Sequence, residues 1–322
     1  MNPSLLSEKQ IDGLWANLKK MNDSKIFMKR FLDFSNSKPH ISNHMIKDYT
    51  FRASDGEKIS ITTYLEKQLF LGKTTIFVHG FKGFKDWGFG PYLGKYFSNK
   101  GFFVITFNFS HNGIGENNTE FTELEKFAKN TYSREVRELN EILDSFRNGY
   151  YEGIDSHSNI GIVGHSRGGA VALLTASNRD DVNAVVTWAA ISKLDRYSNR
   201  QKIEWRKNGF FEALNTRTSQ LMRMNLSLLD DIEQNAGGTL NLKNSVRNLN
   251  KPLLIAHGDQ DLAVPVSEAD EIYKWSDKSK TELFKLFGTG HTFDIVHPFT
   301  GSTEKFEKLL DESTKFLIRN LN

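Results

Sequence analysis

The chain has 322 residues, of which 38% are hydrophobic and 25% are charged, and its formal net charge at pH 7 is +3. Such a composition is typical of a globular protein with one large domain or two small ones, and so small a charge does not indicate nucleic acid as a partner. The absence of cysteine excludes disulfides, thiolate metal ligands and a cysteine nucleophile.

The amino-terminal segment, MNPSLLSEKQIDGLW, lacks the basic and apolar regions of a secretory signal. No apolar run reaches the roughly 18 residues that a membrane span needs, so we expect a cytoplasmic protein. Residues 1–42 are predicted to form a helical extension, because Ser7 and Gln10 have capping-box spacing and apolar residues recur at helical intervals. These helices either dock on the main domain or, through their lysines, lie on a membrane surface.

From residue 43 onward the pattern is that of an α/β protein. Two alternating segments flank Asp55-Gly56, which predicts a β-hairpin. Apolar strand-like runs then alternate with helical segments: TTIFVHG, GFFVITFNF, NIGIVG, VNAVVTWAA, PLLIAHG and ELFKLFG, with a closing amphipathic helix in STEKFEKLLDESTKFLIRNL. Strands that are apolar throughout and are followed by helices predict a mostly parallel sheet, here of the eight-stranded type, with helices on both faces.

Residues 192–250 interrupt this alternation. Nearly sixty residues of helical character are too long for a plain connection, so we expect a helical cap or lid between two core segments, 43–191 and 251–322. Between Lys193 and Arg223 there are eight Lys/Arg and three Asp/Glu, a local net charge of +5. The aromatic residues of this insertion either line an acyl pocket, with arginines that attract a carboxylate, or form its own small core beneath a solvated charged surface.

A nucleophile is predicted at Ser166, in the stretch Gly164-His165-Ser166-Arg167-Gly168. This stretch matches G-x-S-x-G and lies between an apolar strand and an apolar helix, which is the context that the motif requires. The serine of the motif occupies a strained turn, and glycines flank it because a Cβ there would collide with neighbouring backbone. A structural interpretation is that small residues merely let the helix pack close to the strand.

A nucleophilic serine needs a base and an acid that orients the base, and in chains of this type they follow in the order Ser…Asp…His. HGDQDLAVP contains Asp259 and Asp261, of which we choose Asp261, since Asp259 suits a turn cap. GTGHTFDIVHP contains His291 and His297, of which we choose His291, because its Gly-rich loop allows it to reach back over the serine.

The oxyanion of the reaction needs hydrogen-bond donors. We expect the backbone amide of Arg167 to be one, and the amide of Phe81, in the loop after the strand that ends at His79-Gly80, to be the other. His79 itself is interpreted as a structural histidine. The histidines have no metal-ligand spacing, and no dinucleotide-binding or phosphate-binding loop is present, so neither a metal nor a cofactor is expected.

Taken together, HGFKGFKDWG, GHSRGG, HGDQDLAVP and GTGHTF resemble the α/β-hydrolase superfamily over about Tyr49 to Leu321. The resemblance is greatest to the branch similar to dienelactone hydrolases and prolyl oligopeptidases, which includes feruloyl and cinnamoyl esterases. It implies an α/β-hydrolase fold, a triad of Ser166, His291 and Asp261, and an insertion that forms a lid over the acyl pocket.

The function that follows is cofactor-independent serine hydrolysis of a small-molecule carboxylic ester. A peptidase or amidase of the same superfamily has the same triad, and an acyltransferase differs only in excluding water from the site. A binding protein that retained the fold without its chemistry is the alternative from another class, although such proteins generally lack a triad member. The sequence does not indicate an oligomeric state.

Overall fold

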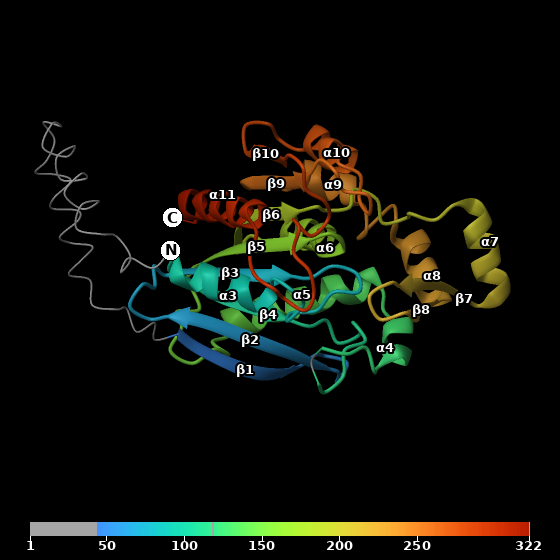
Figure 1. Cartoon of the computed structure of the whole chain (residues 1–322), viewed down its shortest axis with the longest axis horizontal. Helices are drawn as coiled ribbons and strands as arrows, with labels where there is room; N and C mark the ends of the chain where they lie inside the picture. The colour runs from blue at the N-terminus through green and yellow to red at the C-terminus, as the bar shows by residue number, and fades with distance from the viewer. Residues whose placement is uncertain (1–43, 118, 322) are drawn as a thin grey trace, which may run out of the picture. The chain divides into compact units, whose positions relative to one another are not determined.

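The fold is organised around one large β-sheet (Figure 1). The computed structural model describes residues 44–117 and 119–321, so the helices predicted for residues 1–42 lie outside the described part. The sheet has eight strands in the order β1-β2-β4-β3-β5-β6-β9-β10. β2 is antiparallel to both β1 and β4, and the other neighbours run parallel. The prediction of a mostly parallel sheet is therefore confirmed.

The strands coincide with the alternating hairpin and the apolar runs of the sequence. They are β1 (His44–Arg52), β2 (Lys58–Glu66), β3 (Lys73–Val78), β4 (Phe102–Phe107), β5 (Asn159–His165), β6 (Val182–Trp188), β9 (Leu253–Gly258) and β10 (Thr281–Leu286). Gly56 in the β1–β2 turn has a φ of +87°, which the Asp-Gly pair accommodates. The strands β4 and β9 are buried at every residue, because helices cover both of their faces, and this burial explains their lack of alternation.

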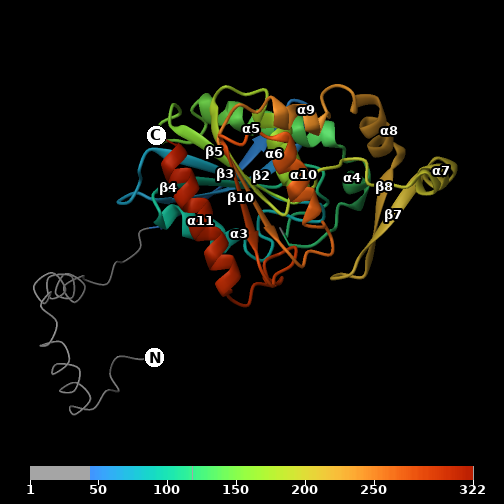
Figure 2. The same cartoon turned by 90° about the horizontal axis from the view of Figure 1, so that it is seen from above.

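Helices pack against both faces of the sheet (Figure 2). Leu93 of α3 (Gly90–Asn99) and Phe306 and Leu310 of α11 (Glu304–Asn320) belong to one buried apolar cluster. Leu139 of α5 (Tyr132–Arg147), Leu173 of α6 (Arg167–Ala176) and Ile272 of α10 (Ser267–Trp275) belong to the other. The helices of these two clusters cover the faces of the sheet, so loops occupy the edge at the carboxyl ends of the parallel strands. In such sheets a site is expected at this edge.

The sequence predicted a helical insertion after β6, but the insertion also contains strands, so this prediction is wrong in part. It contains α7 (Asn199–Asn208), α8 (Leu226–Asn235) and α9 (Leu242–Arg247), but also an antiparallel pair, β7 (Phe210–Asn215) with β8 (Gln220–Asn225). Burial along β8 alternates, with Met222 and Met224 buried and Leu221 and Arg223 exposed. This alternation is the period of a half-buried strand, and it prevails over helix propensity because the buried methionines contribute to the core.

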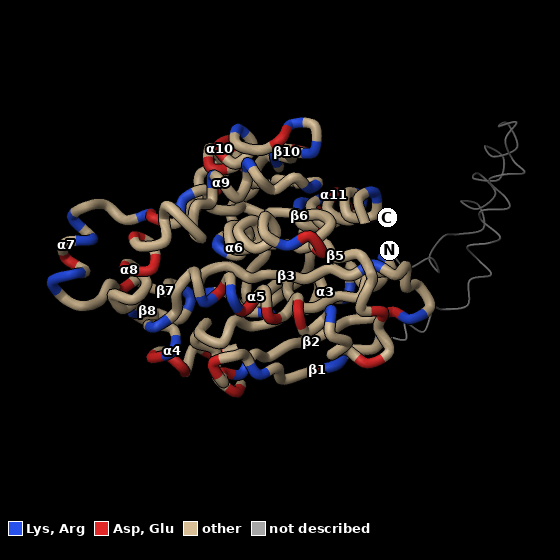
Figure 3. The backbone as a smooth tube through the Cα atoms, turned by 180° about the vertical axis from the view of Figure 1, so that it is seen from behind, with Lys and Arg blue, Asp and Glu red and all other residues tan. Residues whose placement is uncertain are grey.

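Most charges of the insertion are paired within it. Arg206 on α7 contacts Asp230 (3.1 Å) and Glu233 (2.5 Å) on α8, and Figure 3 shows these two helices with their charged residues. The basic segment expected from the sequence is therefore partly neutralised by acidic residues of the insertion, which pair with Arg200, Lys202, Arg206 and Arg223. Trp205 is fully buried and packs edge-on against Tyr197 (4.9 Å between centroids) and beside Phe211 (5.4 Å), so these aromatics do form a local core.

Beyond these elements the described residues contain the short helix α4 (Leu124–Ala128). None of the helices within residues 44–117 and 119–321 has the length and apolar composition that crossing a bilayer requires.

Candidate active site

Ser166 lies at a sharp turn between the end of β5 and the start of α6. Its φ is +56°, a strained value for a residue with a side chain, and its amide donates a hydrogen bond to the Trp188 carbonyl (2.8 Å). A Cβ on Gly164 would lie 2.5 Å from the Gly168 oxygen, and one on Gly168 would lie 2.3 Å from the Val78 oxygen. The glycines of the motif are therefore needed for the close approach of three backbone segments.

The structure brings Ser166, His291 and Asp261 together, as predicted. Ser166 Oγ is 3.0 Å from His291 Nε2, and His291 Nδ1 is 2.7 Å from Asp261 Oδ2. His291 is in the loop after β10, and Asp261 is in the loop after β9, so three strand ends at one edge of the sheet supply the three side chains. This is the arrangement of a nucleophile, a base and an acid that orients the base.

Asp261 is held as an anion by its surroundings. The amides of Ala263 and Val264 donate to its Oδ1 (2.9 and 2.8 Å), and His257 Nε2, which donates to the Val264 carbonyl (2.8 Å), also lies 3.4 Å from Oδ2. Burial acts to raise the pKa of Asp261, but hydrogen bonds from His257 and His291 outweigh burial and hold the pKa well below its usual range. An ionised acid is what the proposed base requires.

The two rejected candidates have structural partners. Asp259 Oδ1 accepts the Gly288 amide (2.7 Å), which ties the loop after β9 to the loop after β10. His297 Nδ1 accepts the Gly88 amide (2.9 Å), and its ring stacks on Trp87 with 6.0 Å between centroids. Neither side chain contacts Ser166, so the choices of Asp261 and His291 agree with the geometry.

The backbone amides of Phe81 and Arg167 both lie close to Ser166, although Phe81 belongs to a distant loop and Arg167 is the next residue in the chain. Arg167 directly follows Ser166, and a Cβ on Gly80, the neighbour of Phe81, would be 2.9 Å from the Ser166 Cβ. Neither amide makes a hydrogen bond to another residue within the described ranges. Two free amides next to the Ser166 hydroxyl suit an oxyanion.

The Arg167 side chain does not reach into solvent. Its Nε donates to Glu135 Oε2 on α5 (2.7 Å), and its guanidinium lies 3.8 Å from the ring centroid of Tyr132. Both partners of this ion pair are about 95% buried. Burial acts to lower the pKa of Arg167, but the charge of Glu135 raises it overall, so the guanidinium stays charged. Burial also raises the pKa of Glu135, against the charge and hydrogen bond of Arg167 and the hydrogen bond of Asn130, which lower it. This pair anchors the start of α6, and hence the elbow, to α5.

Two histidines near Ser166 are neutral and structural. Burial lowers the pKa of His79 to about 4, and its ring donates from Nδ1 to the Gly80 carbonyl (3.0 Å) and accepts the Phe109 amide at Nε2 (3.2 Å). Burial, with the adjacent His291, lowers the pKa of His165 to about 3, and its Nε2 donates to the His291 carbonyl (2.9 Å). The sequence offered no signal for this contact or for that of His257, because both depend on the packing of separate loops.

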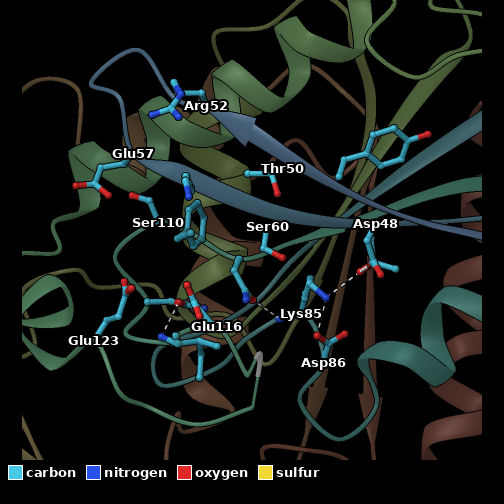
Figure 4. A pocket seen from close by; sticks show the side chains of 18 of the residues that line it. Asp48, Thr50, Arg52, Glu57, Ser60, Lys85, Asp86, Ser110, Glu116 and Glu123 are labelled. Carbon is cyan, nitrogen blue, oxygen red and sulfur yellow. Dashed lines mark hydrogen bonds and ion pairs between the residues drawn. The ribbon is translucent and has the colours of Figure 1, made fainter.

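A cavity of about 480 Å³ lies beside Ser166, a size typical of small-molecule sites. Its apolar lining comes from the core and from the insertion, and includes Phe81, Phe84, Trp87, Tyr132, Ile191 and Tyr197. A larger cavity, of about 900 Å³, lies along β1 and β2 (Figure 4). Its Lys85 already contacts Asp86 (2.6 Å) and Thr62 (2.8 Å), and none of Ser166, His291 and Asp261 lines it, so we place the site in the smaller cavity.

Comparison with known proteins supports both the fold and the class. The sequence profile of the prolyl oligopeptidase family matches residues 88–321. No curated protein sequence gives a significant match. Among solved structures, the α/β-hydrolase GrgF from Penicillium sp. sh18 is 16% identical, with a TM-score of 0.66 and coverage of 86% of this chain and 99% of that one.

Two further structures have the same fold. The esterase domain of a Rhodothermus marinus protein is 19% identical, with a TM-score of 0.59 and coverage of 86% of this chain and 100% of that one. Est1E from Butyrivibrio proteoclasticus, solved with ferulic acid bound, is 18% identical, with a TM-score of 0.63 and coverage of 84% and 98%. At these identities the similarity establishes the α/β-hydrolase fold, as predicted.

Proposed function

The chain belongs to the prolyl oligopeptidase family of α/β-hydrolase-fold serine hydrolases, and from this premise we propose that it cleaves a carboxylic ester through an acyl-enzyme on Ser166. The observation that carries the proposal is the hydrogen-bonded series Ser166–His291–Asp261, with distances of 3.0 and 2.7 Å. An activated serine needs a base within hydrogen-bond reach, and these distances satisfy that condition without rearrangement.

In the proposed mechanism, Ser166 Oγ attacks the ester carbonyl while His291 Nε2 takes its proton. Asp261 holds the Nδ1 proton of His291 and stabilises the imidazolium that forms. The amides of Phe81 and Arg167 receive the oxyanion. His291 then protonates the leaving alcohol, and a water molecule, activated by the same histidine, releases the acid and restores Ser166.

We propose further that residues 192–250 act as a cap over the acyl pocket. The support is that Tyr197 and Arg217 of the insertion line the same cavity as Phe81 of the core. A cap of this kind shields the acyl-enzyme and selects substrates by the side chains that it presents.

The first experiment is labelling with a fluorophosphonate probe, read by intact mass spectrometry. We expect one adduct on the wild type and none on Ser166→Ala. Ser192→Ala is a matched control, because Ser192 is also buried but bonds to Glu268 rather than to a histidine, and it should retain the adduct. An adduct on Ser166→Ala would exclude Ser166 as the nucleophile.

A peptidase is the second candidate, because the family is named after oligopeptidases. Matched substrates with one acyl group, a 4-nitrophenyl ester and the corresponding 4-nitroanilide, separate the two functions. Beyond the difference in intrinsic reactivity measured in buffer, we expect acceleration of the ester only. Comparable acceleration of the anilide would favour the peptidase.

A further inference from the structure

The cavity beside Ser166 has an unbalanced charge. Among the described residues, four cations line it, Lys82, Arg167, Arg196 and Arg217, and no Asp or Glu does. Two of these cations are neutralised from outside the cavity: Arg167 by Glu135 (2.7 Å) and Arg196 by Glu268 (2.6 Å). For the other two, no carboxylate of the described residues lies within ion-pair distance, so a net positive charge is left facing the site.

Arg217 belongs to the turn between β7 and β8, at the tip of the hairpin of the insertion. The turn is stabilised by the Arg217 amide, which donates to Asn215 Oδ1 (3.3 Å). Its guanidinium packs on Phe84 (5.5 Å to the centroid) and on Phe121 (5.7 Å), both from the core. Within the described residues, Arg217 Nη1 is buried and has no hydrogen-bond acceptor.

Asn215 presents a second such donor. The residue is 5% exposed and lines the cavity, and its Nδ2 is buried without an acceptor in the described part of the chain. Buried donors are nearly always paired, because an unpaired one loses its hydration without compensation. Two residues that line the proposed active site, Asn215 and Arg217, therefore each have a buried, unpaired N–H donor, one of them charged.

The unpaired cations also repel each other. Burial lowers the pKa of Lys82, and the charge of Arg217 lowers it further, while burial lowers the pKa of Arg217. In the part of the chain that the structure describes, the Lys82 ammonium donates only to the Leu214 carbonyl (3.0 Å), a neutral acceptor. An anion in the cavity would relieve this repulsion and satisfy both donors of the turn.

We propose that the substrate is an ester that carries a free carboxylate, bound by Arg217 and Asn215 in the field of Lys82. A carboxylate has two oxygens, one for the charged Nη1 donor of Arg217 and one for the Nδ2 donor of Asn215. This inference rests on the proposed ester hydrolysis at Ser166 and adds to it the residues that select the substrate.

The test uses matched substrate pairs. In the first set, each acid is a 4-nitrophenyl monoester of succinic, glutaric or adipic acid, and its neutral partner has the free carboxylate masked as a methyl ester. In the second set the carboxylate is on the alcohol: each acid is the butyryl ester of a hydroxy acid, and its neutral partner is the same compound with the carboxylate methylated. The readout is the ratio of kcat/KM for the acid to that for its neutral partner. We expect at least one wild-type pair to favour the acid about 10-fold or more, since hydrogen bonds to charged groups contribute this much.

Three variants locate the source of that ratio. In Arg217→Gln the ratio should fall about 10- to 100-fold. Asn215→Asp keeps the oxygen that caps the turn but replaces the free donor with a negative charge, and should lower the ratio as well. Arg200→Gln is the control, because it removes the same charge from an 88% exposed side chain of the insertion, and its ratio should stay within twofold.

The outcomes distinguish this inference from the proposed function. The inference is overturned if the neutral ester is hydrolysed at least as fast as its acid partner in every pair, or if the ratio is unchanged in Arg217→Gln. Either result leaves the proposed chemistry at Ser166 intact. If no ester is cleaved, titration calorimetry of Ser166→Ala protein with glutarate and adipate decides: binding that is lost in Arg217→Gln supports the carboxylate site, and no binding at 10 mM refutes it.

Discussion

The ion pair between Glu135 and Arg167 makes a prediction about stability. Glu135→Gln removes the charge that compensates the buried guanidinium while keeping the size of the side chain. Glu135 accepts hydrogen bonds from Arg167 Nε and from Asn130 Nδ2, both at 2.7 Å. In the glutamine variant one of these two donors would face the new NH₂ group, which is a donor as well, and would lose its acceptor. Both residues are nearly fully buried, so water cannot replace the lost partner.

The expected magnitude follows from this burial. Breaking a buried ion pair from one side costs about 3–5 kcal/mol of unfolding free energy. At about 2 °C per kcal/mol for a chain of this size, the unfolding temperature should fall by roughly 6–10 °C. The matched control is Asp144→Asn on the same helix, whose partner is Arg179 (2.5 Å) but whose side chain is 55% exposed. An exposed pair of this kind contributes about 0.2–1 kcal/mol.

The assay is urea unfolding followed by circular dichroism, with thermal unfolding in parallel. The double variant Glu135→Met/Arg167→Met should recover at least half of the loss, because it leaves no uncompensated charge in the interior. A loss in Glu135→Gln no larger than in Asp144→Asn would refute the reasoning, since it would mean that Arg167 does not need Glu135 in the folded state.

Two further predictions concern the loop after β3. Gly80→Ala places a Cβ 2.9 Å from the Ser166 Cβ, which displaces the neighbouring Phe81 amide and should lower kcat by a factor of about 10²–10³. The control is Gly237→Ala, because nothing lies within 4 Å of its new Cβ. Equal kcat values for the two variants would contradict the role of the loop after β3. Because burial lowers the pKa of His79 to about 4, the unfolded chain takes up its proton first, so stability should fall as pH falls from about 6.5 to 4, by on the order of 3 kcal/mol for this residue. Urea unfolding across that range should show a shallower pH dependence in His79→Gln, and an unchanged one would show that His79 is not held neutral.

Much of the site followed from local pattern. A glycine-flanked serine between an apolar strand and an apolar helix predicts an elbow, and a Cβ at either flanking glycine would collide with backbone there. Asp261 and His291 follow the neighbouring parallel strands β9 and β10, and the ends of parallel strands meet at one edge of the sheet. The strand order itself, with β4 between β2 and β3, is a tertiary outcome that the sequence does not specify.

Other features arose only from contacts between segments that are distant in the chain. The β7–β8 hairpin escaped prediction because its alternation is short and lies in a basic, helix-rich segment; its buried face exists only where the methionines meet the core. The charge of the insertion suggested an anion in general. Which cation is unpaired depended on packing: Arg206 meets acidic residues of α8, whereas Arg217 meets the rings of Phe84 and Phe121.

The sequence by itself therefore predicted the strands of the main sheet, the glycine-flanked turn and the proposed nucleophile, acid and base, because each of these is marked by a short local motif. The tertiary structure decided which donors remain unsatisfied around Ser166 and which histidines are held neutral. Burial and pairing are properties of several segments at once: Asn215 and Arg217 lie more than 130 residues from Lys82 in the chain, and only folding brings them to one cavity.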